Sequence, residues 1–456
     1  MRPTRWRRST HLVIGVAVLV LVAALVAAAA VMTRHQSVQA APPNVRPQPA
    51  LVTAQPRVQP VSDAAAEPVP AQLAAVLAPL AANPNLGMLG GRVTDALTGT
   101  ELWTQGANIP LQPASTNKTL TAAAALLTLD RNARLTTTVL AGDTPDVVVL
   151  KGGGDPTLSA APPGTDTWYG DAARISDLAD QVRKTGVTPR AVQVDISLFS
   201  GPTMAPGWDV ADIEGGDWAP IQSVMIDAGR IQPTTVESKR STTPALDAGR
   251  ALAAALRVDP ANVTIRTTPA SGQQIAAVQS PPLIERLREM MWASDNVMAE
   301  SIGREVAAAV NQPQSFDGGV RAVLGQLSKA GLTTSGATLF DASGLSVNDR
   351  LTATVLDDVV NAAAGNSEPR LRPLLDVLPI AGGSGTLWNR YVDTPSAGYL
   401  RAKTGSLTGT NALAGVVTDQ SGRVLTFALI SNNAGPEGRT ALDALAAAFR
   451  SCGCGS

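Results

Sequence analysis

The sequence predicts an α+β fold in which one antiparallel sheet is built from both ends of the chain. Residues 86–108 read as a strand, a tight turn and a second strand, and residues 399–409, 411–419 and 423–433 form three further strand-like runs. Helical patterns, apolar at a period of about 3.6 residues, occupy much of the chain between them. Strands near both ends with helices between them are typical of a body whose sheet joins the two halves of the chain.

The chain begins with a basic tail, residues 1–11, and a long apolar segment. Residues 12–32 carry no charge and would rise about 31 Å as a helix at about 1.5 Å per residue, which is enough to span a bilayer. We interpret them as a transmembrane anchor; a cleaved signal peptide, with residues 37–41 as its cleavage site, is the alternative. Because the arginines before this segment stay in the cytoplasm, the rest of the chain is expected to be extracytoplasmic, in the cell envelope, or secreted if the segment is cleaved.

The remaining residues divide into a linker and a two-part body. Residues 33–70 are rich in proline and poor in large apolar side chains, which favours an extended linker. A short helix at 71–84 opens the body, which we predict as parts 71–146 and 282–451 separated by an inserted β-rich unit, 147–281. Two short strand patterns in a glycine- and proline-rich setting indicate this inserted unit, and an amphipathic helix at 438–450 closes the body.

Composition excludes several kinds of chemistry. The 456 residues carry a net charge of -1, so no broad basic surface for nucleic acid is expected. Both histidines, His11 and His35, flank the N-terminal apolar run, and both cysteines, Cys452 and Cys454, lie in residues 452–456, which we interpret as a frayed tail. A Ser-His-Asp triad, a cysteine nucleophile and a His- or Cys-ligated metal site are therefore excluded from the body, and no cofactor is expected.

Ser115 and Lys118 stand together at the start of an apolar helix. Side chains three residues apart on a helix have Cβ atoms about 5–6 Å apart, so the lysine amine can reach the serine hydroxyl. Burial lowers a lysine pKa, ordinarily about 10.4, and can make the amine a base that activates the serine. The simpler alternative is a serine cap with the lysine extended to water. The absence of histidine from the body favours the catalytic interpretation.

Two further polar motifs follow. Ser294, Asp295 and Asn296 interrupt an apolar helical run, and they are either a capped helix break or a hydroxyl and an amide offered to a substrate. Lys-Thr-Gly occurs twice. Lys184-Thr185-Gly186 ends a helical pattern and is ordinary capping. Lys403-Thr404-Gly405 lies in strand-like sequence, where Lys403 and Thr404 can hold an anion and Gly405 lets a ligand approach the backbone.

Ser-x-x-Lys, Ser-Asp-Asn and Lys-Thr-Gly in this order are the combination typical of penicillin-binding proteins and class A β-lactamases. The chain from about residue 71 to 450 resembles the low-molecular-mass class C penicillin-binding proteins, the D-alanyl-D-alanine carboxypeptidases and endopeptidases of the cell wall. This resemblance implies a serine β-lactamase/DD-peptidase-like body with an insertion between Lys118 and Ser294. It is carried by residues 113–118, 152–158, 294–296, 341–346, 381–387 and 402–409.

The resemblance also implies a substrate and a mechanism. The substrate would be a peptidoglycan stem peptide ending in D-Ala-D-Ala, and β-lactams would be covalent inhibitors. Ser115 would be acylated by the D-Ala carbonyl, with Lys118 as its base. Ser294 would help to pass the proton to the departing D-Ala.

The same resemblance implies which groups would bind the substrate. Asn296 would bind its amide, and Lys403 and Thr404 would bind its terminal carboxylate. The backbone N–H groups of Ser115 and Ser406 would form the oxyanion hole. Such a hole stabilises the negative charge that develops on the carbonyl oxygen during acyl transfer.

The chain departs from the family pattern at two places. Ala342 stands where the family often has glycine. Residues 207–220 resemble an element that approaches the cleft, with Trp218 where tyrosine is common. Trp208, Asp212 and Trp218 are therefore candidates for substrate contact, although buried tryptophans and a solvated aspartate are the simpler interpretation.

Two other functions remain as alternatives. A β-lactamase of class A needs a glutamate that positions the hydrolytic water, and no Glu-x-x-Leu-Asn pattern supplies one. A non-catalytic exported protein that binds cell-wall peptides would need no intact Ser115, Lys118 and Lys403, yet the chain has all three.

Overall fold

The computed structural model describes residues 20–26 and 64–452. Residues 20–26 are helical, and within the described ranges no helix is both long and apolar enough to cross a bilayer. The anchor predicted over 12–32 and the linker predicted over 33–70 lie mostly outside the described residues and stay predictions. The chain divides into two units, Met1–Pro60 and Val61–Ser456, and all strands found among the described residues belong to the second.

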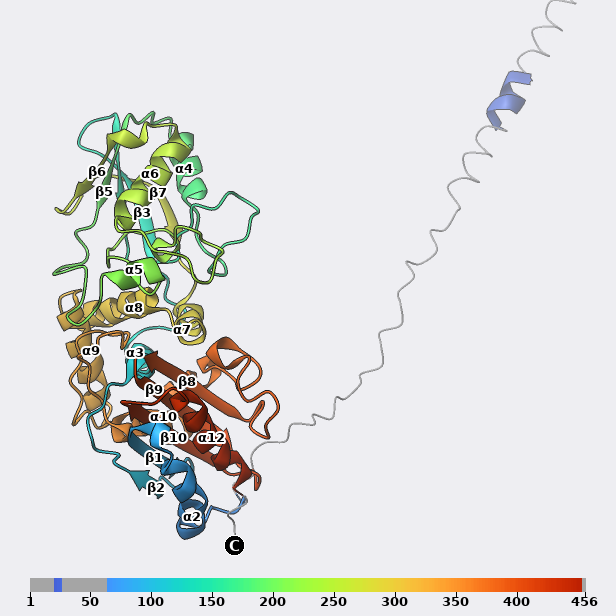
Figure 1. Ribbon diagram of the computed structural model, residues 1–456. Helices are drawn as coiled ribbons and strands as arrows, with labels where there is room; N and C mark the ends of the chain where they lie inside the picture. Colours follow the sequence, from blue (N-terminus) through green and yellow to red (C-terminus); the bar gives the residue numbers. More distant parts are fainter. Residues whose placement is uncertain (1–19, 27–63, 453–456) are drawn as a thin grey trace, which may run out of the picture. The chain divides into compact units, whose positions relative to one another are not determined.

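The first sheet joins the two ends of the body, as the sequence predicts. Its five strands run antiparallel in the order β2-β1-β10-β9-β8, so the N-terminal strand β1 pairs directly with the C-terminal strand β10 (Figure 1). In this register Val93 of β1 lies opposite Phe427 of β10. The strands are β1 (Met88–Asp95), β2 (Glu101–Gln105), β8 (Leu400–Leu407), β9 (Thr410–Thr418) and β10 (Val424–Asn432).

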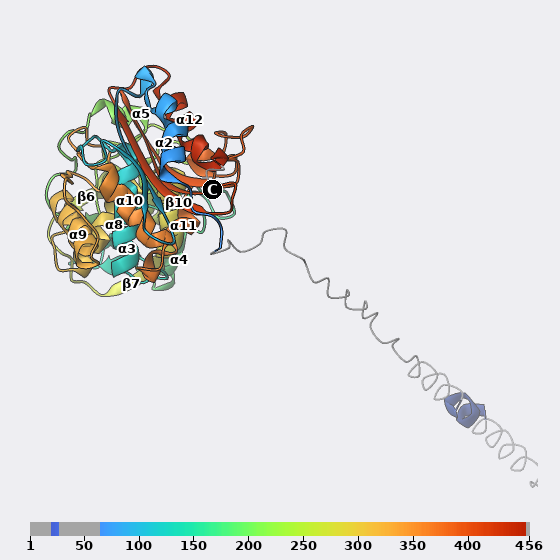
Figure 2. The ribbon, with the colours of Figure 1, turned by 90° about the horizontal axis from the view of Figure 1, so that it is seen from below.

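Two helices from the ends of the body cover one face of this sheet. Helices α2 (Pro70–Ala81) and α12 (Gly438–Ser451) pack on each other, and α12 also packs on β9 and β10 (Figure 2). Phe449 of α12 lies against Phe427, with ring centroids 5.3 Å apart. The helix predicted at 438–450 is therefore confirmed, and its apolar side anchors it to the sheet.

Cys452 continues this packing beyond α12. Its side chain is buried in the same apolar cluster as Phe449, and it is disulfide-bonded. The frayed tail predicted from residue 452 onward is therefore wrong at Cys452, because the apolar face of α12 continues into it. Residues 453–456 lie outside the described ranges.

The opposite face of the sheet is covered by a helical layer. Helix α10 (Ala353–Ala364) packs on β1, β9 and β10, and α3 packs against α7, α8, α9 and α10. Helix α3 is buried from Lys118 to Leu126 because its alanines and threonines let neighbouring helices approach closely. Besides α10, the helices of this layer are α3 (Lys118–Thr128), α7 (Leu283–Trp292), α8 (Asn296–Ala309), α9 (Phe316–Lys329) and α11 (Leu374–Val377).

The region between α3 and α7 carries a second sheet, in the order β6-β5-β4-β3-β7. The pairs β4–β5 and β5–β6 are parallel, whereas β3 runs antiparallel to both of its neighbours. Two helices, α4 and α6, accompany the sheet, so this unit is mixed α and β rather than only β-rich. Its elements are β3 (Thr136–Ala141), β4 (Val147–Lys151), α4 (Ile175–Lys184), β5 (Ala191–Asp195), α5 (Ala211–Gly215), α6 (Pro244–Leu256), β6 (Val263–Arg266) and β7 (Gln274–Gln279).

Strand β3 begins at Thr136, ahead of residue 147, where we predict the start of the inserted unit. Its pairing with β4 and β7 places it in the second sheet. Short 3-10 helices connect the larger elements at η1 (Pro84–Leu86), η2 (Ala114–Asn117), η3 (Asp227–Gly229), η4 (Pro260–Asn262), η5 (Pro369–Leu371) and η6 (Gly385–Leu387).

Candidate active site

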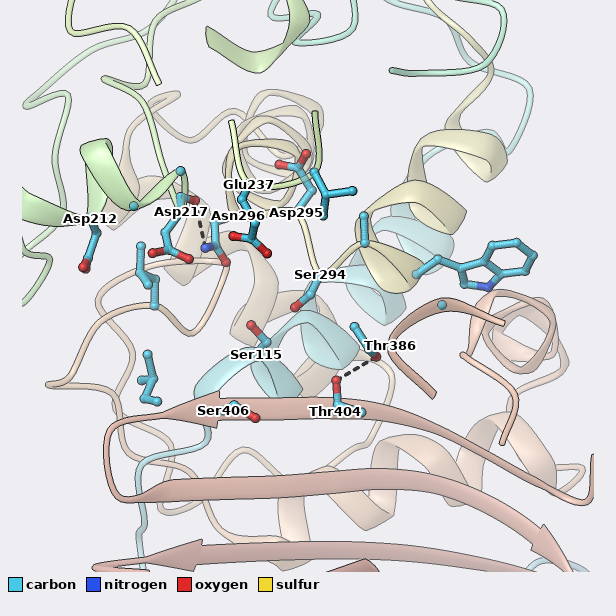
Figure 3. Close-up of a pocket in the computed structure, with 18 of the residues that line it drawn as sticks. Ser115, Asp212, Asp217, Glu237, Ser294, Asp295, Asn296, Thr386, Thr404 and Ser406 are labelled. Carbon is cyan, nitrogen blue, oxygen red and sulfur yellow. Dashed lines mark hydrogen bonds between the residues drawn. The ribbon is translucent and has the colours of Figure 1, made fainter. Parts of the chain in front are cut away.

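One large cleft, about 1370 Å³, lies where the edge strand β8, the start of α3 and the junction of α7 with α8 meet. Segments of the inserted unit line it from the other side (Figure 3). The predicted residues Ser115, Ser294, Asn296, Thr404 and Ser406 all line this cleft. The three motifs are thus brought to one place.

Ser115 lies on the 3-10 turn η2, and Lys118 begins α3 directly after it. The Lys118 side chain is fully buried, and its Nζ donates to Ser115 Oγ at 2.9 Å. It also donates to Asn296 Oδ1 at 2.6 Å and to the Ser343 carbonyl at 2.8 Å. The alternative of a lysine extended to water is wrong, because every donor of this amine points to a protein acceptor.

Two opposing effects set the protonation of Lys118. Burial lowers the pKa of its amine to about 8, although the nearby carboxylates of Asp341, Asp295, Glu300 and Asp217 partly oppose that shift. A pKa near 8 leaves a useful fraction of the amine neutral close to neutral pH.

Ser294 and Lys403 form a second hydroxyl–amine pair. Lys403 Nζ donates to Ser294 Oγ at 2.9 Å and to the Thr404 carbonyl at 2.8 Å. Burial, with Lys118 and Arg390 nearby, holds the Lys403 pKa well below its usual range. Ser294 has a φ of +57°, a left-handed conformation that turns its hydroxyl out of the helical run. The Ser294 hydroxyl is thus paired with Lys403, while Lys118 is paired with Asn296.

Asp295 and Asn296 share the first turn of α8 but serve different neighbours. Asp295 caps the helix by accepting from the Met298 N–H at 3.0 Å, so the capped-break interpretation is correct for this residue. Asn296 points into the cleft, where its Nδ2 donates to the Asp217 carbonyl of the inserted unit at 3.0 Å. This bond leaves its Oδ1 facing Lys118.

Asp295 also connects the motif to the inserted unit. Its Oδ2 accepts from the Tyr169 hydroxyl at 2.6 Å and lies 3.6 Å from Arg230. Burial alone would raise the Asp295 pKa, but Arg230, Arg240 and these hydrogen bonds lower it to about 2. The contacts of Tyr169 and Arg230 with Asp295 could not be predicted from the sequence, because only the fold brings these residues together.

Strand β8 is the outermost strand of the first sheet, so one of its edges faces the cleft. Thr404 Oγ1 donates to Thr386 Oγ1 at 2.8 Å, which sets two hydroxyls side by side near Ser294. Thr386 lies in the motif at 381–387 but was not singled out from the sequence. Residues 379–381 pair with the start of this edge, at Leu400–Ala402, so the part beyond Ala402, with its adjacent hydroxyls, can receive an extended peptide and its terminal carboxylate.

Gly405 has a structural function in addition to the predicted one. A Cβ at this position would lie 2.7 Å from the Pro113 carbonyl oxygen and 3.1 Å from Ala114 Cβ. Glycine therefore lets the turn that carries Ser115 lie against β8. Ser406, the next residue on β8, lies beside the turn that carries Ser115 (Figure 3).

The candidates from the inserted unit separate into two groups. Trp208 and Trp218 are buried, stack edge to face with centroids 4.8 Å apart and donate to Asp341 Oδ2 and the Asp209 carbonyl. The simpler interpretation, buried tryptophans, is correct for both. Asp212 lines the cleft, where burial and the neighbouring Asp209 raise its pKa. Asp217 and Glu237 line the cleft beside it and were missed, since carboxylates in a loop give no local signal.

Backbone geometry answers two further questions that the sequence raised, at Lys184-Thr185-Gly186 and at Ala342. Lys184 ends α4 and Gly186 has a φ of +81°, which confirms ordinary capping at the first Lys-Thr-Gly. The φ of Ala342 is not positive, so an alanine side chain at this position causes no backbone strain. The space it needs comes from Gly303, where an added Cβ would lie 2.8 Å from Ala342 Cβ.

Comparison with known proteins identifies close relatives. Residues 73–242 and 237–449 match the D-Ala-D-Ala carboxypeptidase 3 (S13) family, and residues 1–60 match the Carboxypeptidase Rv3627c-like N-terminal domain. The sequence is 67% identical to Carboxypeptidase DacB of Mycolicibacterium smegmatis over 100% of both chains.

Solved structures share the fold. Penicillin binding protein 4 of Haemophilus influenzae superposes with a TM-score of 0.65 at 23% identity, covering 80% of this chain and 93% of that one. The same protein complexed with a β-lactam superposes with a TM-score of 0.60 at 23% identity, covering 81% and 97%.

Proposed function

The chain belongs to the D-Ala-D-Ala carboxypeptidase 3 (S13) family of serine peptidases, and from that premise we propose that Ser115 is its nucleophile and Lys118 the base. One observation carries the proposal: a fully buried amine lies 2.9 Å from a hydroxyl that lines the cleft. The substrate is a peptidoglycan stem peptide ending in D-Ala-D-Ala.

Acylation begins when neutral Lys118 takes the proton of Ser115 Oγ. The oxygen attacks the carbonyl carbon of the penultimate D-Ala, and the backbone N–H groups of Ser115 and Ser406 stabilise the resulting oxyanion. The C–N bond then breaks and an ester to Ser115 remains. The proton taken from Ser115 is passed through the Ser294 hydroxyl to the amine of the departing D-Ala. Water later hydrolyses the ester, with Lys118 again as base.

The edge of β8 supplies the binding surface. The hydroxyls of Thr404 and Thr386, with the charge of Lys403 behind them, receive the terminal carboxylate. The peptide before the scissile bond continues along the edge past Ser406. Asn296 holds Lys118 in place and offers its amide to the substrate. Asp212 is the inserted-unit candidate that lines the cleft.

We also propose that β-lactams inhibit the enzyme covalently. The Haemophilus protein that shares this fold forms a complex with a β-lactam. Attack by Ser115 opens the lactam ring, and the leaving nitrogen stays tethered to the acyl group. The ester persists, because the sequence lacks the Glu-x-x-Leu-Asn pattern that positions a hydrolytic water in class A β-lactamases.

Residues 12–32 anchor the protein to the cytoplasmic membrane in this proposal, with the body outside. The uncharged run and the arginines before it support both statements. Fractionation of cells with the full-length chain, followed by protease treatment of spheroplasts, tests them. Recovery of the intact chain from the membrane fraction and digestion of the body from outside are expected. Recovery of a shortened chain in the medium would favour a cleaved signal.

The catalytic proposal is tested by labelling the full-length protein with a fluorescent penicillin and mapping the modified residue. Lasting label on Ser115, absent from Ser115→Ala, together with release of D-Ala from a pentapeptide, is expected. Rapid turnover of the drug would indicate a β-lactamase instead. No label and no D-Ala release would indicate a protein that only binds cell-wall peptides.

A further inference from the structure

Helix α8 presents a second polar side chain toward Lys118, one turn beyond Asn296. Asn296 and Glu300 are four residues apart and therefore lie on the same face of the helix. Asn296 accepts directly from Lys118. Glu300 is only 1% exposed, and neither the motifs nor the proposed mechanism uses it.

Glu300 reaches the Lys118 environment through the loop at 341–344. Its Oε1 accepts from the Ala342 N–H at 2.9 Å. The next residue, Ser343, supplies the carbonyl that accepts from Lys118 Nζ at 2.8 Å, and the Ala342 carbonyl accepts from Thr121 of α3 at 2.6 Å. A single stretch of backbone thus connects the Glu300 carboxylate to the Lys118 amine.

The charges around Glu300 leave its own charge adjustable. Arg304 donates to Glu300 Oε2 at 3.2 Å, while the nearby carboxylates of Asp341 and Asp349 repel the charge of Glu300. Burial and Asp341 raise the pKa of Glu300 to about 7, although Arg304 opposes the shift. Glu300 therefore changes charge near neutral pH.

Three other carboxylates, those of Asp341, Asp295 and Asp217, act on Lys118. Asp341 accepts from the backbone N–H groups of Ser343, Gly344 and Ser346 and from Trp208, so hydrogen bonds occupy both of its oxygens. Asp295 is held by Arg230 and Tyr169, and its pKa of about 2 keeps it ionised at neutral pH. Asp217, which lines the cleft and whose pKa is raised by burial, and the Lys403 amine also act on Lys118.

We propose that Glu300 is a positioning residue whose charge controls how readily Lys118 loses its proton, while its hydrogen bond to Ala342 holds the Ser343 carbonyl in place. Ionised Glu300 stabilises the Lys118 ammonium. Protonated Glu300 removes that stabilisation, so Lys118 becomes a neutral base at lower pH. The proposal rests on Lys118 being the base that activates Ser115.

The test measures the rate of acylation by a fluorescent penicillin against pH, for wild type and Glu300→Gln. Glutamine can keep the bond to the Ala342 N–H but carries no charge. The pH at which the rate is half-maximal is expected to fall by roughly one unit, at the low end of the effect of a neighbouring charge. The variant is then acylated faster than wild type between about pH 7, above which wild-type Glu300 is ionised, and the wild-type midpoint, and the difference disappears at lower pH.

A matched control is available on the same helix. Glu305 also pairs with a buried arginine, with its Oε2 3.2 Å from Arg286 Nη2, but the carboxylates that act most on Lys118 are those of Asp341, Asp295, Glu300 and Asp217. Glu305→Gln is expected to lower stability without moving the pH midpoint. Because Glu300→Gln leaves Arg304 without its partner, the double variant Glu300→Gln with Arg304→Met is measured as well, and it should show the same shift.

The outcomes separate this inference from the proposed function. If wild type shows no rise in rate with pH, or Lys118→Met is acylated normally, the assignment of Lys118 as base fails. If wild type shows the rise but both Glu300 variants keep its midpoint, or Glu305→Gln shifts it equally, the inference about Glu300 is overturned.

Discussion

Lys118 Nζ lies 2.6 Å from Asn296 Oδ1, although 178 residues separate the two in the chain. This hydrogen bond joins the Ser-x-x-Lys and Ser-Asp-Asn motifs. The bond from Asn296 Nδ2 to the Asp217 carbonyl extends the connection into the inserted unit. The inserted unit therefore takes part in orienting the side chain that holds Lys118.

Replacing Lys118 tests its chemistry separately from its charge. Lys118→Met removes the base, and Lys118→Arg keeps a cation that cannot lose its proton, so both are expected to slow acylation by about 10²–10⁴-fold. Stopped-flow measurement of penicillin acylation checks this. Arginine that supported a near wild-type rate would show that only a positive charge is needed.

The pH dependence follows from the lowered pKa of Lys118, about 8. Only the neutral amine accepts the serine proton, so the acylation rate should rise with pH and level off above about 8. An amine with its ordinary pKa would give a rise that continues to about 10. A rate that falls between pH 6 and 8 would contradict the assignment.

Lys403→Met should remove the partner of Ser294 while preserving most of the buried volume. We expect D-Ala release from a pentapeptide to fall at least about 10²-fold. The leaving amine then has no path by which to receive its proton, and the substrate carboxylate has lost the Lys403 cation. The matched control is Lys184→Met in the other Lys-Thr-Gly, at the end of α4, which should keep full activity. Equal losses in both variants would point to a general effect on folding.

Asp295 links stability to pH. Its pKa is about 2 in the folded chain against an ordinary value of 3.8, so it contributes roughly 2 kcal/mol that is present above about pH 4 and is lost as pH falls through 2. Asp295→Asn keeps a helix cap but leaves Arg230 unpaired. Urea unfolding at pH 7 should show a lower free energy of unfolding, and the difference from wild type should shrink at acid pH. A difference independent of pH would exclude this linkage.

Trp208 and Asp212 should respond differently to substitution. Trp208→Phe loses the indole bond to Asp341 and should lower the free energy of unfolding by about 1–3 kcal/mol. Asp212→Asn, at the cleft, should leave stability nearly unchanged and alter KM for stem peptides. Thermal denaturation and peptide kinetics on both variants test this. A stability loss in Asp212→Asn as large as that in Trp208→Phe would contradict the distinction.

Local pattern accounts for the features that sequence could predict. Strands β9 and β10 of the first sheet are mostly apolar and are bounded by turn residues, and α12 has a clear amphipathic period. The spacing of Ser115 and Lys118 within one turn places their side chains together whatever the rest of the chain does. Helical context likewise separates Lys184 from Lys403.

The sequence by itself thus determined the class of fold, the three motifs and the absence of histidine from the body, because each depends on residues close together or on composition. Only the tertiary structure decided that the Lys118 side chain is buried, that Asn296 rather than Ser294 accepts a hydrogen bond from it, and that Trp208 is buried. It also brought Thr386, Arg230 and Glu300 to these motifs. Such contacts join residues many turns apart, and burial depends on which elements pack over a side chain, so neither is encoded in a local pattern.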